Sequence, residues 1–431
     1  GTTWSQQSYL KPAAVGITQA FDQFGWSVAV AGDTVVVGAR YEDGSMTGIN
    51  NAPDDAGAPN GGGYYTFDSG AAYVFVRSGS FWSQQAYLKP AAVGSSQAND
   101  QFGYSVAVSG DTAVVGAILE KSSTTGVNST ANEGANASGA AYVFVRSGNL
   151  WAQQAYLKPA AVGTTQAGDY FGWSVAVSSN TVVVGAPYEQ SSTTGVNSTA
   201  NESAIRAGAA YVFSRSGSLW TQQAYLKPAN VGTTQEDDQF GQSVAVSGDL
   251  VVVGAPLEKS GTTGVNSTPN ESVTWAGAAY VFSRSGSLWT QQAYLKPGAI
   301  GTNQTNDNFG NSVAVSDGTV VVGAWWEDSS TTGVNSTANE IANEAGAAYL
   351  FAGFLPEPEI RIFAGADDTA PELTDGQVAA VDFGSTLLGT PVTRSFTVKN
   401  VGAADLHVSG LTLPAVYEYT GTAFPWTLVP N

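Results

Sequence analysis

The chain has 431 residues, 43% of them hydrophobic, which is enough to bury a core and to form more than one domain. Its formal net charge of -19 disfavours nucleic acid and anionic membranes as partners, and its lack of cysteine excludes disulfides, thiolate nucleophiles and zinc–thiolate sites. No apolar run approaches the roughly 18 residues of a membrane span. No signal-peptide pattern is present. We therefore expect a mature or trimmed secreted chain, a view that its richness in Thr, Ser, Asn and Gly favours.

A repeated phrase, Trp followed by Gln-Gln and Tyr-Leu-Lys-Pro, opens each of five units. It begins at Trp4, Trp82, Trp151, Trp220 and Trp289. A Phe-Gly pair follows at Phe24, Phe102, Phe171, Phe240 and Phe309. The spacing is 69 residues, except for 78 in the first interval. Such self-similarity indicates a repeat architecture.

Each unit contains four short apolar segments that we predict to be strands. In the third unit they are Ser174–Val177, Thr181–Gly185, Ala209–Phe213 and Trp220–Leu226. The first two are joined by residue types that accept the positive φ of a two-residue hairpin turn, as in Gly32-Asp33. The unbroken apolar run in the second strand and the glutamines of the fourth predict that burial falls from the inner to the outer strand.

Four antiparallel strands at this period predict one blade of a β-propeller. The fifth unit stops after Ala347–Phe351, without the Trp strand that ends the others, whereas the chain opens with that strand at Trp4–Leu10. We therefore predict an all-β fold, in which residues 1–354 form a five-bladed propeller of four-stranded antiparallel blades. The N-terminal strand would close the ring and remove its exposed edges.

The unit resembles the FG-GAP repeat, the blade of integrin α-subunit propellers and of many bacterial extracellular proteins. The resemblance rests on Phe171-Gly172, Ser174-Val175-Ala176, Val184–Pro187 and Gly208–Phe213, and it recurs in all five units. Three units depart from Gly-Ala-Pro, with Gly38-Ala39-Arg40, Gly116-Ala117-Ile118 and Gly323-Ala324-Trp325. Integrins have seven blades. The resemblance implies a bacterial, extracellular propeller.

A second domain is predicted after a stiff Pro/Glu linker at residues 355–359. Residues 360–431 resemble an Ig-like sandwich of the ASH type through Val381–Ser385, Thr393–Asn400 and Gly402–Leu406. Such a sandwich typically needs about 100 residues, so its last strands are missing. Either the chain was cut short, or a neighbouring subunit donates a strand and so builds a filament.

Several polar residues recur blade by blade, which favours structural tasks. The aspartates Asp22, Asp100, Asp169, Asp238 and Asp307 would cap turn amides before the first strand. The glutamates Glu42, Glu120, Glu189, Glu258 and Glu327 would orient the long loop after the second strand or hold a metal. The lysines Lys11, Lys89, Lys158, Lys227 and Lys296 would end the outer strand and stay solvated.

Calcium is the one cofactor that these residues suggest. The two-residue turn between the first two strands excludes the integrin-type site, which leaves the long loop, where side-chain carbonyls and one carboxylate could bind calcium weakly. The candidate ligands in two such loops are Glu120, Asn128 and Asn132, and Glu189, Asn197 and Asn201. The first loop differs and carries Asp43, Asp54 and Asp55. The same loops carry Asn-Ser-Thr glycosylation sequons at Asn128, Asn197, Asn266 and Asn335.

The sequence favours a protein that binds rather than catalyses. The only histidine, His407, sits between apolar residues of the small domain, which argues against a hydrolytic triad. We expect a secreted cell-surface structural or adhesive protein with a protein partner or a second copy of itself. The alternative is a glycan-binding propeller with one site per blade, built from the long loops or the outer tryptophans. Trp325 and Trp326 break the repeat and are expected to contact a partner or a glycan.

Overall fold

The computed structural model contains strands and no helix among the residues that it describes. These are residues 4–13, 19–54, 68–91, 97–160, 163, 166–229, 232, 234–298, 304–354, 360–365, 372–373, 392–400, 406–408, 410, 418–419, 423 and 425–429. No helix in these ranges is long and apolar enough to cross a membrane. The chain divides into two compact units, of which the first holds nearly all of the five repeats and the second contains Gly353–Asn431.

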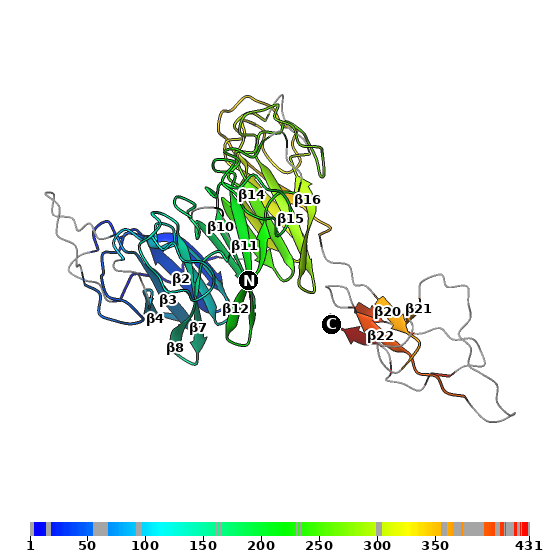
Figure 1. Ribbon diagram of the computed structural model, residues 1–431, viewed down its shortest axis with the longest axis horizontal. Coiled ribbons are helices and arrows are strands. Elements are labelled where there is room, and N and C mark those ends of the chain that lie inside the picture. Colours follow the sequence, from blue (N-terminus) through cyan, green and yellow to red (C-terminus); the bar gives the residue numbers. More distant parts are fainter. Residues whose placement is uncertain are drawn as a thin grey trace. The chain divides into compact units, whose positions relative to one another are not determined.

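Each of the first four repeats folds into one four-stranded antiparallel sheet, with its strands in chain order. Figure 1 shows strands of such blades lying side by side, as in β2 to β4 and β14 to β16. The first blade is β1 (Phe24–Ala31), β2 (Thr34–Ala39), β3 (Ala71–Ser78) and β4 (Phe81–Leu88). The second is β5 (Phe102–Ser109), β6 (Thr112–Ala117), β7 (Ala140–Ser147) and β8 (Leu150–Leu157).

The remaining repeats continue the pattern. The third blade is β9 (Ser174–Ser178), β10 (Thr181–Ala186), β11 (Ala209–Ser216) and β12 (Leu219–Leu226). The fourth is β13 (Ser243–Ser247), β14 (Leu250–Ala255), β15 (Ala278–Ser285) and β16 (Leu288–Leu295). The fifth is β17 (Phe309–Ser316), β18 (Thr319–Ala324) and β19 (Ala347–Phe351). The predicted all-β, five-bladed propeller with four-stranded antiparallel blades is thus confirmed.

The tight turn between the first two strands of each blade depends on residues that accept a positive φ. Gly110 has φ 54° between β5 and β6, and Ser179 has φ 50° between β9 and β10. The predicted hairpins are therefore confirmed. The predicted decline in burial is confirmed from β10, which is fully buried, to the outer strand β12, which is partly exposed. It is wrong for the innermost strand β9, which is only half-buried.

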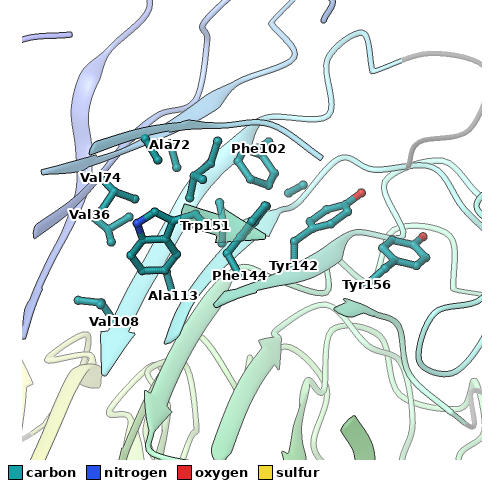
Figure 2. Close-up of a cluster of buried hydrophobic side chains, with 14 of the residues drawn as sticks. Val36, Ala72, Val74, Phe102, Val108, Ala113, Tyr142, Phe144, Trp151 and Tyr156 are labelled. Carbon is teal, nitrogen blue, oxygen red and sulfur yellow. The ribbon is translucent and has the colours of Figure 1, made fainter. Parts of the chain in front are cut away.

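The core lies between neighbouring blades. Small side chains from one blade face aromatic side chains from the next, and the cluster between the first two blades includes Val36, Val74, Phe102, Phe144 and Trp151. Figure 2 shows the indole ring of Trp151 close to Val36 and to Ala113. Trp151 of the outer strand, which is 6% exposed, therefore packs between the two blades.

The fifth blade has three strands in the described part of the chain, in the order β17-β18-β19. The N-terminal segment, defined as residues 4–12, was predicted to supply its fourth strand. It forms no strand pairing there, and Trp4 is fully exposed. The segment lies instead against the first blade, where its Gln7 accepts a hydrogen bond from Trp82. The predicted closure by strand pairing is therefore not formed in this structure.

The second unit contains short strands. One sheet has β21 (Glu372–Leu373), β20 (Ile360–Phe363) and β22 (Thr397–Asn400), and a second pairs β23 (Leu406–Val408) with β24 (Trp426–Leu428). The predicted linker at 355–359 and the motif at 381–385 lie outside the described residues. The Ig-like assignment therefore stays a prediction.

Candidate functional site

Each of the first four blades contains a buried lysine bonded to a buried glutamate. In the second blade, Lys158 Nζ donates to Glu120 Oε2 at 3.2 Å, to Ser138 Oγ at 2.9 Å and to the carbonyl of Gly139 at 2.6 Å. Tyr156 Oη donates to the other carboxylate oxygen of Glu120 at 3.0 Å. We call this arrangement the Lys–Glu cluster. Its counterparts pair Lys89 with Glu42, Lys227 with Glu189 and Lys296 with Glu258.

The prediction that these lysines stay solvated is wrong. Lys89, Lys158, Lys227 and Lys296 are all 0% exposed. Each follows the outer strand and runs under the long loop that the glutamate begins. A buried ammonium group needs a paired carboxylate and further acceptors, and the cluster supplies both. Burial lowers the pKa of Lys158, while the neighbouring Glu120 carboxylate opposes that shift. The recurring glutamate thus has the loop-orienting role expected of it.

The fifth blade keeps the glutamate of this cluster without the lysine. Glu327 is 4% exposed, and among the described residues it accepts a hydrogen bond from the backbone of Ser329 but forms no ion pair. Burial raises its pKa. The lysine and tyrosine that would fit this site by sequence register are Lys11 and Tyr9 of the N-terminal segment, and both are exposed. The chain therefore contains both halves of a fifth Lys–Glu cluster, Glu327 in the fifth blade and Tyr9 with Lys11 in the N-terminal segment, and they are not joined.

The Gln-Gln pairs of the second and third outer strands fasten their blades to both neighbouring blades. Gln153 accepts a hydrogen bond from the backbone of Ala91, in the preceding repeat, at 2.8 Å. Gln154 lies at a bulge between two paired positions of β8, which turns its side chain outward. It accepts a hydrogen bond from Trp220 Nε1 of the following blade at 2.7 Å. The same two contacts recur along the propeller.

The N-terminal segment makes these same contacts with the first blade. Gln7 takes the place of a second glutamine and bonds to Trp82 at 2.7 Å, and the amide of Ala13 donates to Gln84 at 2.7 Å. Relative to the first blade, the segment therefore lies where the outer strand of a preceding blade would lie.

The calcium candidates of the second and third blades have protein partners. Asn128 Oδ1 accepts a hydrogen bond from the amide of Tyr156, and Asn132 Oδ1 accepts from the amides of Ser123 and Gly134. In the third blade, Asn197 and Asn201 repeat these bonds, and Glu189 is held by Lys227. Asn128 and Asn197 thus connect the long loop to the outer strand, whereas Asn132 and Asn201 form hydrogen bonds within the loop, as self-satisfied polar loops do.

In the first loop, the two predicted aspartates that the structure describes also have protein partners. Asp54 accepts two hydrogen bonds from Ser45, at 2.6 and 2.8 Å, and Asp43 accepts one from the amide of Asp68 at 3.0 Å. Asp55 lies outside the described residues. Within the described ranges no three acidic or histidine side chains come together as a metal site. Calcium binding there stays a prediction.

The recurring aspartates are buried, and burial dominates their acidity. It raises the pKa of Asp100 to about 7, although Lys121 lies 3.1 Å away and lowers it. The third blade has Gln190 in place of that lysine, and burial together with Glu189 raises the pKa of Asp169 to about 8. The raised pKa values mean that burial favours the protonated form of these carboxyl groups.

Sequence reasoning missed a continuous row of aromatic rings at one end of the inner strands. We define this aromatic row as Trp26, Tyr104, Trp173, Tyr170 and Tyr188. Ring centroids lie 5.8 Å apart from Trp26 to Tyr104 and 5.1 Å apart from Tyr104 to Trp173. In the third blade, Tyr170 and Tyr188 are 5.0 Å apart and both contact Trp173. The signal in the sequence was a departure from the repeat, because these aromatics are absent from the matching positions of the fourth blade.

The other residues singled out in the sequence are found in several parts of the chain. Trp325 and Trp326 of the fifth blade stack on each other at 4.9 Å with an interplanar angle of 12°, and Trp325 is 54% exposed. His407 lies in β23 of the second unit. The four sequon asparagines, Asn128, Asn197, Asn266 and Asn335, are all exposed.

The fold and the contacts between blades define a propeller built from repeats. The sequence of the repeat identifies its family. The FG-GAP repeat family matches residues 4–75, 82–144, 151–213, 220–282 and 289–351. The chain therefore belongs to that family, whose propellers serve protein–protein interaction at a general level and are typically non-catalytic.

The other comparisons add little. No curated protein matches the chain in sequence. The chain is similar to a solved structure described as "Crystal structure of GH43_1 enzyme from Xanthomonas citri", at 9% identity and a TM-score of 0.29, over 69% of this chain and 80% of the other. A likeness this weak carries no conclusion about activity.

Proposed function

We propose that this is a secreted, non-catalytic cell-surface protein of structural or adhesive role, whose copies assemble head to tail. In this assembly the N-terminal segment of one copy completes the fifth blade of the next. The expected strand donation is thereby assigned to the propeller rather than to the second unit. The observation that carries the proposal is the incomplete Lys–Glu cluster at Glu327.

The fifth blade offers a site already built for the donated strand. Its β19 edge has no partner on one side among the described residues, and β19 carries Leu350, which is 73% exposed. A docked segment would bring Lys11 and Tyr9 to Glu327 in the arrangement that Lys158 and Tyr156 show at Glu120. The strand edge would at the same time gain backbone hydrogen bonds, as in other cases of strand addition.

The side of the first blade that would meet a neighbouring fifth blade is also uncovered. Val28 and Val30 of β1 are 68% and 69% exposed, whereas Val108, which matches Val30 by register, is 9% exposed in the second blade. Ser105 Oγ donates to the carbonyl of Gly172 across the blade interface at 2.7 Å, and Ser312 would make the matching bond to Gly25. One chain thus exposes both the open side of its first blade and the open edge of its fifth blade. This favours a second copy of the chain as the partner of each surface.

Reciprocal charge variants test the assembly. Lys11→Glu and Glu327→Lys should each keep the protein monomeric by light scattering at concentrations where the native chain forms oligomers. Mixing the two variants should restore oligomers, because the two substituted positions then meet with opposite charges at one joint, and the native Lys11 and Glu327 meet at the other. A native chain that stays monomeric at every concentration, with variants that only lower its melting temperature, would show self-closure instead and contradict the proposal.

Secretion and surface location need their own measurement. Antibody labelling of intact cells, compared with labelling of lysed cells, should detect the protein outside. Label confined to lysed cells would contradict the surface role.

The second candidate function is a lectin with one site per blade. The structure does not favour the version of it in which the outer tryptophans bind the sugar. Trp151, Trp220 and Trp289 are 6%, 1% and 2% exposed, so the outer tryptophans of these three blades cannot present a face to a sugar. The aromatic row favours carbohydrate binding at one surface that the first three blades share, rather than at one site per blade.

A further inference from the structure

The aromatic row departs from a repeat that is otherwise closely kept. After each Phe-Gly pair the five blades carry Trp26, Tyr104, Trp173, Gln242 and Asn311. The neighbouring residues in β1, β5, β9 and their counterparts are almost unchanged. The aromatic residues therefore do not belong to the packing that every blade shares, since blades with glutamine or asparagine at this position fold in the same way.

The row is accessible and lies on rigid elements. Trp26 is 46% exposed, and Tyr104, Trp173, Tyr170 and Tyr188 are partly exposed. Trp26 and Tyr104 stand at the starts of paired strands, and Tyr188 follows directly after β10. Such placement holds the rings in fixed positions, which lowers the entropic cost of binding a ligand.

Polar groups flank the rings at both ends of the row. At one end, the guanidinium of Arg40 stacks 3.3 Å from the centre of Trp26, and its Nε donates to Gln23. At the other end, Arg206 lies 5.8 Å from the Tyr188 ring. Tyr170, Tyr188, Gln190, Ile205 and Arg206 line a hollow of about 360 Å³ there. Stacked arginines keep in-plane N–H donors available.

We propose that the aromatic row binds a neutral oligosaccharide, whose apolar sugar faces stack on the rings while its hydroxyls bond to the arginines and glutamines at the two ends. The combination of an apolar surface with a few placed donors is what such a site requires. The proposal goes beyond the head-to-tail assembly and does not depend on it.

Two other ligands fit the same surface less well. A polyproline helix docks in slots between aromatic rings, but here adjacent rings touch one another, with centroids 5.0 to 6.1 Å apart. A polyanion would be attracted by Arg40 and Arg206, but the chain carries a net charge of -19, which repels it. A neutral sugar meets neither obstacle.

The test is binding of an array of neutral and acidic oligosaccharides, followed by titration calorimetry of any neutral hit. The Lys11→Glu variant should be the background, so that assembly does not affect the result. Trp173→Ala and Tyr104→Ala should each weaken binding about tenfold, which corresponds to the loss of one stacked ring. Tyr104→Phe keeps the ring and should stay within about threefold.

The matched control is Gln242→Ala, at the same register in the fourth blade, which should bind like the parent. All variants should keep the parent's β-sheet circular dichroism. Three results would overturn the proposal. No neutral sugar binds at about 1 mM, the affinity is unchanged in Trp173→Ala, or the substitutions reduce the binding of acidic sugars only.

Discussion

The buried lysine of the second blade is the residue whose removal should affect the propeller most clearly. In Lys158→Met, the carboxylate of Glu120, 3% exposed, loses its counter-ion, and the carbonyl of Gly139 loses its 2.6 Å hydrogen bond. Breaking a buried ion pair from one side typically costs about 3–5 kcal/mol. We expect a loss of that size in the free energy of unfolding, measured by urea denaturation followed by tryptophan fluorescence.

A double-mutant cycle separates the ion pair from the rest of the cluster. Glu120→Leu should cost about as much as Lys158→Met, because it leaves the ammonium group alone. The double variant should lose much less stability than the sum of the two single losses. Its remaining cost is that of the unpaired Tyr156 hydroxyl and Gly139 carbonyl, about 1–3 kcal/mol each.

Lys11→Met is the matched control, because Lys11 occupies the same place in the motif but is exposed. At a concentration where the protein is monomeric, its effect should stay within about 0.5 kcal/mol. An effect of Lys158→Met below about 1 kcal/mol, or a strictly additive cycle, would refute the reasoning.

Three further outcomes follow from the blade interfaces and the buried aspartates. Gly185→Ala places a Cβ into the carbonyl of Gly241 on the next blade and should lower the free energy of unfolding by at least about 1–3 kcal/mol. Gly323→Ala, whose Cβ would meet only Ser312 of its own blade, should cost less. Equal losses of stability in thermal melts would contradict this. Because the folded pKa of Asp169, about 8, is raised above its ordinary value, its stabilising contribution is present at low pH and is lost as the pH rises from about 4 to 8. Asp169→Asn should therefore raise the melting temperature at pH 8 but not at pH 4, and a variant equally stable or less stable than the parent at pH 8 would refute the assignment. Trp220→Phe removes the hydrogen bond to Gln154 and should cost about 1–3 kcal/mol, most of which the added Gln154→Leu substitution should recover in the same melts.

The repeat was sufficient to predict the blades, because hydrophobic runs and turn residues act locally and recur five times. The buried lysine was missed because Lys158 precedes a proline at a strand end, a position that is usually solvated. Its partner could have been found: Glu120 recurs in step with it, and two opposite charges that recur together in every blade are candidates for a buried pair.

The aromatic row needed the fold, because its rings come from segments far apart in the sequence. Trp26 and Tyr104 are separated by a whole repeat and become neighbours only when β1 and β5 pack side by side. The contacts of the N-terminal segment with the first blade also join residues far apart in the sequence, such as Gln7 and Trp82. Neither feature has a local signature.

The glutamine contacts between neighbouring blades, which we call joints here, make the blades interchangeable. Each blade presents the same acceptors to the blade before it and to the blade after it, so a joint between the second and fourth repeats would use the same atoms as the present one between the second and third. A gene that gained or lost one 69-residue unit would therefore encode a chain in which every remaining joint is already correct. The number of repeats can therefore change during evolution without new mutations at the contacts between blades.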